Sequence, residues 1–488
     1  MSVHLDETAP YGPGTHPNEH QSTTTAGLVD SDVPNEDPCT TESYAEPRVS
    51  RCRQLVTVLA AFTVNFTACG LLFTFGIYQA LYESMATQYS GPFTHASSSE
   101  IDLIGSLSAS VMTMAAPFAV AWAKYFDTPR VVWAGALLFG LANVLASFGT
   151  ALWHFQLAQG LLLGIGTSLS FVPSMTVTPT WFRGRTGLAM GIASAGTGIG
   201  GLVWAPVVTA CIDTMGFRDT LRLTGALAAA LIGAAGFALD WEPTMRSRLH
   251  AESAAISPAG GLFRIPLPAW QMVKQRKFIA HGLGAAFQSA AYYTPVFFLV
   301  SYAQSLGYTE KQGANFVAVS NACNAIGKIS IGFVADKMGR VNTFFLSTFL
   351  SAVAAIGLWL PSAVLGTAHE APGRHLYIAF TVLYSIFASA YVSLFPAILV
   401  ELFGVKQLPY TTGVLYMAQG MAALVGTPVA GVLVRGSDGA KRSDDYTGMT
   451  ILVSSLLLAT SACVAWVRFE LLLPSSSSVS EKHRRWKI

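Results

Sequence analysis

The chain has 488 residues, of which 52% are hydrophobic and only 11% are charged, and its formal net charge is +2. This composition is typical of a membrane protein rather than of a large water-soluble enzyme, and the small net charge gives no sign of a nucleic-acid partner. Apolar stretches of about 20 residues, the length that crosses a hydrocarbon core of about 30 Å, follow one another from Leu55 to Leu473. The sequence therefore predicts an all-α integral membrane protein.

Residues 1–50 differ in kind from the rest of the chain. They are rich in Asp, Glu, Pro, Thr and Ser, and they contain no Lys or Arg before Arg48. Without an apolar run this segment has nothing to bury, so we expect a disordered tail. A secretory signal would need a basic start and an apolar region, and neither is present.

Twelve membrane-spanning helices are predicted from the apolar stretches. The longest internal break, at residues 241–276, is basic and rich in proline, so we interpret it as a linker between two six-helix bundles, 51–240 and 277–472, with a short tail at 473–488. The predicted helices cover residues 54–82, 101–124, 130–149, 152–180, 185–211, 219–239, 278–304, 312–334, 341–360, 375–401, 409–434 and 447–472.

Basic residues indicate the orientation of these helices. Lys and Arg gather before the first helix, in the central linker and after the last helix, which all lie on one side of a twelve-helix chain. Cytoplasmic segments are the ones enriched in these residues. We therefore expect both termini in the cytoplasm, and we expect the plasma membrane as the location.

The two predicted halves share a short pattern at the end of their second helix. Asp127 follows that helix in the first half, and Asp336 and Arg340 follow it in the second. Transporters are commonly built from such repeats, with the substrate site at their interface near the middle of the membrane. We interpret these three residues as candidates for an inner gate.

The fifth predicted helix is rich in glycine. Its glycines form two i, i+4 pairs on neighbouring faces, Gly187 with Gly191 and Gly196 with Gly200. Small residues at this spacing let helices approach closely, which predicts a packing surface, static or sliding. Arg183 and Arg185 precede the helix and are either further gate candidates or ordinary anchors at the cytoplasmic surface.

Lys328 is the most informative polar residue. It lies eight residues before Asp336 (336 − 328), about 12 Å along the helix axis. A cation at this depth costs on the order of 2.5–3.5 kcal/mol unless it faces water or a partner. We expect Lys328 to face a central cavity and attract an anion; the alternatives are a lysine that reaches the headgroups and one that pairs with an acid.

Other polar and aromatic residues at membrane depth are candidates for substrate contacts. Asn321, Asn324 and Lys328 recur at i, i+3 and i+7, and therefore share one face of the eighth helix. For each residue taken singly, a hydrogen bond between helices is an equally good explanation. The remaining candidates are Asn65, Tyr292, Tyr293 and Tyr391.

Several motifs together resemble the monocarboxylate porter family of the major facilitator superfamily, and the fungal branch most closely. They are WFRGRTGLAMGIASAG from Trp181, FGIYQ from Phe75, SLFPAILVELFG from Ser393 and GTPVAG from Gly426. The resemblance implies a major facilitator fold with 12 transmembrane helices in two six-helix halves. It also implies that the protein is a secondary transporter and not an enzyme. It also implies that Lys328 occupies the basic position that family members use for a substrate carboxylate.

The chain departs from the family pattern at three places. Arg51-Cys52-Arg53 stands near the place of an acidic-Gly-Gly element, Asn324 replaces an acid, and Phe73 falls near the place of a lysine. These departures favour a ligand that is larger or less charged than lactate.

Motifs of other function classes are missing from the sequence. It contains no Gly-x-x-x-x-Gly-Lys-[Ser/Thr] phosphate loop, no His-Glu-x-x-His and no Gly-x-Ser-x-Gly, which argues against an ATP-driven pump and the common hydrolases. The six cysteines are scattered, without the spacing of a zinc site. We expect no catalytic residue, cofactor or metal.

The sequence therefore predicts a secondary active transporter that moves a small organic, acidic metabolite by alternating access, and we favour efflux of a secondary metabolite. One alternative is uptake of a monocarboxylate or a riboflavin-like nutrient, and another is a non-transporting membrane sensor. The expected partners are the small organic substrate and the lipid bilayer, without nucleic acid; a co-transported proton is left open. We expect a monomer to be functional.

Overall fold

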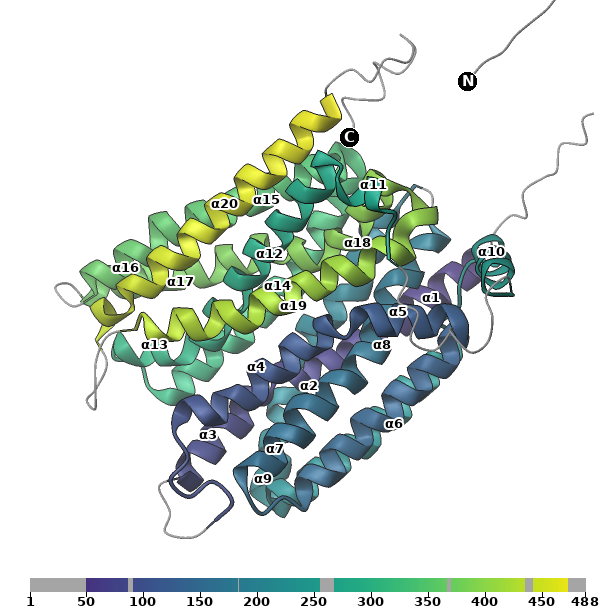
Figure 1. The fold of residues 1–488 in the computed structure, drawn as a ribbon. Coiled ribbons are helices and arrows are strands. Elements are labelled where there is room, and N and C mark those ends of the chain that lie inside the picture. Colours follow the sequence, from purple (N-terminus) through teal and green to yellow (C-terminus); the bar gives the residue numbers. More distant parts are fainter. Residues whose placement is uncertain are drawn as a thin grey trace, which may run out of the picture. The chain divides into compact units, whose positions relative to one another are not determined.

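The computed structural model describes residues 50–86, 91–182, 184–254, 267–366, 370–434 and 442–472. These residues form helices and turns, with no strand among them. The tails predicted at 1–50, apart from Ser50, and at 473–488 lie outside the described residues. The first half of the chain forms six spans, numbered here in chain order, and its helices run alongside one another (Figure 1).

Short breaks divide most of the first six spans into several helices. Span 1 consists of α1 (Arg51–Val64), the π-helix η1 (Asn65–Cys69), α2 (Gly70–Phe73) and α3 (Phe75–Ala86). Span 2 consists of α4 (Ser98–Met114) and α5 (Ala116–Tyr125), and span 3 is α6 (Thr128–Ser147). Span 4 consists of α7 (Leu152–Phe155), η2 (Gln156–Leu162), α8 (Leu163–Val177) and η3 (Thr178–Trp181), and spans 5 and 6 lie in α9 (Thr186–Gly236).

The 51-residue run α9 contains two spans because it is broken at Gly216. A straight helix of this length would measure about 76 Å, more than twice the thickness of the hydrocarbon core. Gly216 has φ 81° and ψ 163°, a conformation that glycine adopts without steric cost and other residues rarely do. The chain therefore reverses at Gly216 and crosses the membrane a second time.

The second half repeats the arrangement. Span 7 consists of α12 (Arg276–Phe297) and α13 (Leu299–Ser305), span 8 is α14 (Glu310–Met338), and span 9 consists of α15 (Arg340–Ala354), η5 (Ala355–Trp359) and α16 (Leu360–Leu365). Span 10 consists of α17 (Glu370–Ala388) and α18 (Ala390–Phe403). Span 11 is α19 (Leu408–Val432), preceded by η6 (Val405–Gln407), and span 12 is α20 (Thr447–Leu472), preceded by η7 (Ser443–Tyr446).

The number of spans agrees with the twelve that the sequence predicts. In the described part of the chain, nine helices are long and apolar enough to cross a membrane, and two bent pairs raise the number to eleven. Because α9 holds two spans, the total is twelve. The span predicted at 278–304 is present as two helices that bend by 53° near Phe298, close to Pro295, which lacks a backbone N–H donor.

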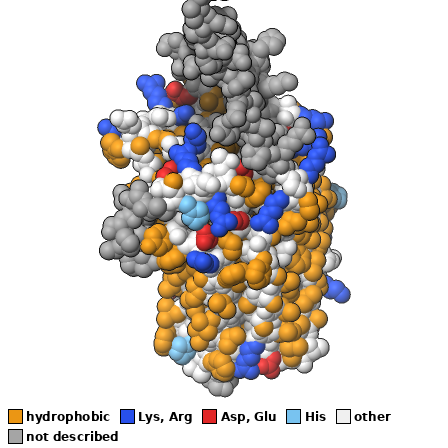
Figure 2. Space-filling view, turned by 90° about the vertical axis from the view of Figure 1, so that its right-hand side faces the viewer, with side chains coloured by type: hydrophobic (Ala, Val, Ile, Leu, Met, Phe, Trp, Pro, Cys, Tyr) orange, Lys and Arg blue, Asp and Glu red, His pale blue; other side chains and the backbone are white. Residues whose placement is uncertain are grey.

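Hydrophobic side chains cover the flank of the bundle along its length, and charged side chains gather near its ends (Figure 2). Leu137 on span 3 is 70% exposed, and Val425 on span 11 is 62% exposed. Such exposure is expected where lipid replaces water as the solvent. Between spans 6 and 7, the described residues form α10 (Pro243–Ala254) and α11 (Trp270–Val273), and we call the end of the bundle where α10 lies the linker end.

The predicted glycine pairs of span 5 pack against two different neighbours. A Cβ at Gly191 would meet the backbone carbonyl of Lys328 on span 8, and one at Gly187 would meet Gly332 of the same span. A Cβ at Gly200 would meet the carbonyl of Phe66, and one at Gly196 that of Phe62, both on span 1. The expected packing surface is confirmed: the face of Gly187 and Gly191 joins the two halves of the molecule, and the face of Gly196 and Gly200 packs within the first half.

Replacing Gly200 with alanine is expected to destabilise the protein, although alanine is the better helix former by about 1 kcal/mol. The new methyl group would clash with a backbone carbonyl that has little room to move, and such overpacking costs about 1–3 kcal/mol. Gly233→Ala on span 6 is the matched control because nothing lies within 4 Å of its Cβ position. Thermal unfolding of the purified variants measures the difference; equal melting temperatures would contradict the packing described here.

Candidate functional site

A central cavity lies between the two halves of the molecule. Spans 1, 2, 4 and 5 line it from the first half, and spans 7, 8, 10 and 11 line it from the second. Its free volume is about 30 Å³, which is enough for one or two water molecules but not for an organic metabolite. The cavity is therefore closed in this structure, and a substrate can enter only after the halves separate.

Lys328 lines this cavity from span 8. Its side chain is fully buried, and within the described residues no atom forms a hydrogen bond with its Nζ. The side chain does not reach the lipid headgroups, because it is fully buried. It does not pair with an acid either, because the described lining contains none. An unpaired buried cation is costly, so this site is poised to receive a negative charge.

Aromatic side chains make up half of the cavity lining and come from both halves of the molecule. The first half provides Phe73 and Phe171. The second half provides Tyr292, Tyr293, Tyr391, Phe395 and Tyr416. The rings of Phe73 and Tyr293 face each other across the two halves, with centroids 6.2 Å apart and planes inclined by 21°.

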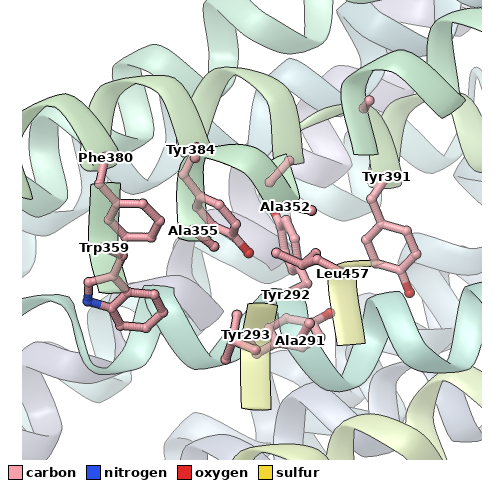
Figure 3. Close-up of a cluster of buried hydrophobic side chains, with 14 of the residues drawn as sticks. Ala291, Tyr292, Tyr293, Ala352, Ala355, Trp359, Phe380, Tyr384, Tyr391 and Leu457 are labelled. Atoms are coloured by element: carbon pink, nitrogen blue, oxygen red, sulfur yellow. The ribbon is translucent and has the colours of Figure 1, made fainter. Parts of the chain in front are cut away.

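Tyr292, Tyr293 and Tyr391 belong to a large cluster of buried hydrophobic side chains in the second half (Figure 3). Tyr292 and Tyr293 are neighbours on span 7, and the ring of Tyr292 lies 5.4 Å from that of Tyr391 on span 10. Farther from the cavity, Phe380 stacks between Trp359 and Tyr384, at centroid distances of 4.8 and 5.1 Å. Aromatic pairs at these distances stabilise a core, so this wall of the cavity is held rigidly.

Gln419 on span 11 is a cavity residue that the sequence analysis missed. It is 2% exposed, and its amide nitrogen forms no hydrogen bond with any described residue. Two unpaired donors, Lys328 Nζ and Gln419 Nε2, therefore line one small cavity. The sequence does contain a signal, because Tyr416 and Gln419 recur at i and i+3 within an apolar span and so share a face.

Three of the predicted substrate contacts lie outside the cavity lining. Asn65 donates a hydrogen bond to the Ala61 carbonyl at 2.8 Å and accepts one from Thr197. Asn321 packs against Gly201 of span 5, and Asn324 lies 3.5 Å from the Tyr292 hydroxyl, in a separate pocket of about 20 Å³. Lys328, Tyr292, Tyr293 and Tyr391 are the predicted residues that the fold brings together around the cavity.

At the linker end, Asp336 joins the two halves. Its carboxylate accepts hydrogen bonds from the backbone N–H groups of Gly187 and Leu188, both at 2.8 Å. These N–H groups begin span 5, and the N-terminus of a helix favours a negative charge. Arg340 lies 3.6 Å from Asp336 and 3.7 Å from Glu401 of span 10, so it orients Asp336 from within the second half.

A second contact between the halves runs through the linker helix α10. Glu252 accepts hydrogen bonds from Lys124 of span 2 at 2.8 Å and from Tyr410 of span 11 at 2.5 Å. Arg248 also donates to it, at 3.0 Å. Partial burial opposes ionisation of the Glu252 carboxyl, but the hydrogen bonds from Lys124, Tyr410 and Arg248 prevail and hold its pKa at about 2.

Two other predicted gate residues, Asp127 and Arg185, form no hydrogen bond or ion pair between the halves in the described part of the chain. Asp127 lies 3.6 Å from Arg246 and 3.3 Å from His250, and so holds α10 against the first half. Arg185 is exposed and lines a surface crevice beside Arg51. Arg183 lies outside the described residues.

Two six-span halves around a central cavity are the architecture of many secondary transporters. Among solved structures, the human organic anion transporter MFSD10 (TETRAN) has the same fold, with a TM-score of 0.60 over 85% of this chain and 100% of that one, at 14% identity. The family model of the Major Facilitator Superfamily matches residues 58–370 and 324–487. The chain belongs to this superfamily, whose members are carriers and not enzymes.

Its relatives include transporters of fungi and animals. Human monocarboxylate transporter 11 is 28% identical over 408 residues, 83% of this chain and 81% of that protein. The Fujikurins efflux protein of Gibberella fujikuroi is 25% identical over 83% of this chain and 82% of its own. The Probable transporter MCH2 of Saccharomyces cerevisiae is 26% identical over 87% and 84%. The resemblance to the monocarboxylate porters is thereby confirmed, and the protein is a multi-pass membrane transporter.

Proposed function

We propose that this transporter exports a small organic acid by alternating access, with Lys328 binding the acidic group of the substrate. The observation that carries the proposal is the side-chain nitrogen of Lys328, which is buried in a cavity between two six-span halves and has no partner among the described residues. A substrate anion would stabilise the charged form of this lysine. The likeness to a fungal efflux protein supports export, and the likeness to monocarboxylate transporter 11 supports an acid.

The conformational cycle follows from the closed cavity. Asp336 and Glu252 both join the halves at the linker end, so opening on that side requires these contacts to break. Because the cavity is too small for a metabolite, each half must tilt away before substrate binds. We place the linker end in the cytoplasm and the protein in the plasma membrane, with support from the basic residues near that end.

The oligomeric state and the coupling ion complete the proposal. The two halves of the chain enclose the cavity between themselves, and we propose that a monomer is functional. A proton is a candidate for co-transport, although the described lining contains no carboxylate. A pH gradient imposed on proteoliposomes that contain the purified protein tests coupling; flux that ignores the gradient would remove the proton from the proposal.

Transport is tested by expression in yeast cells that are loaded with, or exposed to, a panel of organic acids. Export lowers the cellular content of the substrate, uptake of a monocarboxylate or riboflavin-like nutrient raises it, and a sensor changes neither. The Lys328→Ala variant is the negative control for each acid. If no organic acid moves in a Lys328-dependent way, the proposed function is wrong.

The contact through Glu252 is expected to be independent of pH across the physiological range. Because the pKa of Glu252 is lowered from 4.5 to about 2, the carboxylate is fully ionised above about pH 4.5 and the contact is lost only as pH falls through about 2. Glu252→Gln removes the charge and should favour opening at the linker end. A partly exposed ion pair contributes about 1 kcal/mol, which is a factor of about five in an equilibrium constant. We therefore expect the apparent affinity for substrate added at the linker end to rise about fivefold.

The rise in apparent affinity caused by Glu252→Gln is expected to be the same at pH 5 and at pH 8. A transport assay at both pH values measures it. Asp213→Asn, an exposed acid of span 5 near the opposite end, serves as the matched control and should change nothing. If protonation of Glu252 controlled opening instead, the wild-type protein would behave like Glu252→Gln at pH 5 and differ from it only at pH 8.

A further inference from the structure

The charge of the cavity favours a substrate with a single negative charge. Two fully enclosed side-chain nitrogens in the lining, Lys328 Nζ and Gln419 Nε2, have no partner among the described residues, and both side chains are at least 98% buried. A carboxylate has two oxygens and can accept from both donors at once. The described lining contains one basic side chain and no acid, so it neutralises the charge of a single carboxylate.

The aromatic lining favours a flat substrate. Phe73 of the first half and Tyr293 of the second face each other at a centroid distance of 6.2 Å. A ring inserted between two parallel rings needs their planes to lie about 7 Å apart, because each pair of faces in van der Waals contact lies about 3.5 Å apart. Separation of the two halves would therefore allow Phe73 and Tyr293 each to contact one face of a planar ring.

We propose that the substrate is an aromatic or otherwise planar conjugated monocarboxylate, whose acid is held by Lys328 and Gln419 and whose ring lies between Phe73 and Tyr293. This inference rests on the proposed function and specifies its substrate class. Gln419 thereby becomes a specificity-determining residue, since it supplies the second donor to the acid. A short aliphatic acid would satisfy the donors but leave the ring surfaces without contacts.

Binding to the purified protein in lipid nanodiscs tests the ligand requirements, with 2-naphthoate as the probe. Its matched analogues each remove one feature: decahydro-2-naphthoate lacks the flat ring, 2-naphthamide lacks the charge, and naphthalene-2,6-dicarboxylate adds a second charge. Isothermal titration calorimetry measures the affinities. We expect 2-naphthoate to bind at least tenfold more tightly than each analogue, and equal or tighter binding of the saturated acid would overturn the inference.

Substitutions test the residues. Gln419→Leu should weaken 2-naphthoate binding about tenfold, the value of a hydrogen bond to a charged group. Gln288→Leu is the matched control, because Gln288 is equally buried in the second half but does not line the cavity. Phe73→Leu should reduce the preference for 2-naphthoate over its saturated analogue, while Phe344→Leu, in the core of the second half, should leave that preference intact.

Thermal unfolding shows which variants are folded, and Gln419→Asn, which keeps the amide, replaces Gln419→Leu if the latter does not fold. Unchanged affinity in a folded Gln419 variant would contradict its role. Counterflow of labelled lactate separates this inference from the proposed function. If lactate moves in a Lys328-dependent way but 2-naphthoate does not bind, the aromatic substrate class is wrong and the proposed function stands. If no acid binds or moves in a Lys328-dependent way, the aromatic substrate class and the proposed function are both wrong.

Discussion

Lys328→Ala is expected to lower transport at subsaturating substrate by about 30-fold or more. Truncating one partner of a buried, hydrogen-bonded charge pair costs about 2–5 kcal/mol, and each 1.4 kcal/mol is a factor of ten. Lys328→Arg keeps the charge and should retain part of the activity. Initial rates in proteoliposomes with matched amounts of protein measure the effect.

Substitution of Lys328 is expected to lower transport without lowering the stability of the protein. In the absence of substrate, the ammonium of Lys328 is buried without a partner among the described residues, so Lys328→Met should unfold at a temperature equal to or higher than the wild-type protein. Lys311→Ala, an exposed lysine on the same helix, is the control and should change neither quantity. Normal transport by Lys328→Ala would refute the proposed role.

Asp336→Asn is expected to favour opening at the linker end by about 10-fold or more. The carboxylate accepts two backbone hydrogen bonds from the start of span 5, and a hydrogen bond to a charged group contributes about 1.5–3 kcal/mol. The measurement is the labelling rate of a cysteine introduced at Ala335, which is 1% exposed, in a background without native cysteines. A membrane-impermeant maleimide added at the linker end should react faster in the variant.

Asp219→Asn is the matched control for Asp336→Asn. Asp219 pairs with Arg222 at 2.7 Å within span 6, so its neutralisation leaves the contacts between the halves intact. The turnover rate of Asp336→Asn should also differ from that of the wild-type protein. If the cysteine reacts at the same rate in both proteins and turnover is unchanged, Asp336 does not hold the closed state.

Features that depend on local sequence could be predicted well. Twelve spans follow from the length of the apolar stretches, because each must match the thickness of the bilayer. The packing surface of span 5 follows from the glycine pairs, since small residues at i and i+4 mark a close approach whatever the partner is. The bend of span 7 was missed, although Pro295 lies beside it.

The contacts of individual polar residues could not be predicted in the same way. Asn321 and Asn324 share a face of span 8 with Lys328, yet one packs against span 5 and the other lies beside Tyr292 in a second pocket. A shift of a few ångströms along a helix determines whether a side chain lines the cavity or contacts a neighbouring helix. The sequence shows that these residues lie at membrane depth, but the surroundings of each depend on how the spans cross.

The sequence by itself determined the class of the protein, the number of its spans and the one lysine at membrane depth, because hydrophobic length and the cost of a buried charge are properties of single segments. Only the tertiary structure decided that Gln419 lines the same cavity as Lys328, that Phe73 stacks with Tyr293, and that Glu252 links the two halves. Each of these arrangements brings together residues far apart in the chain. Their distances follow from the packing of whole helices, which no local pattern specifies.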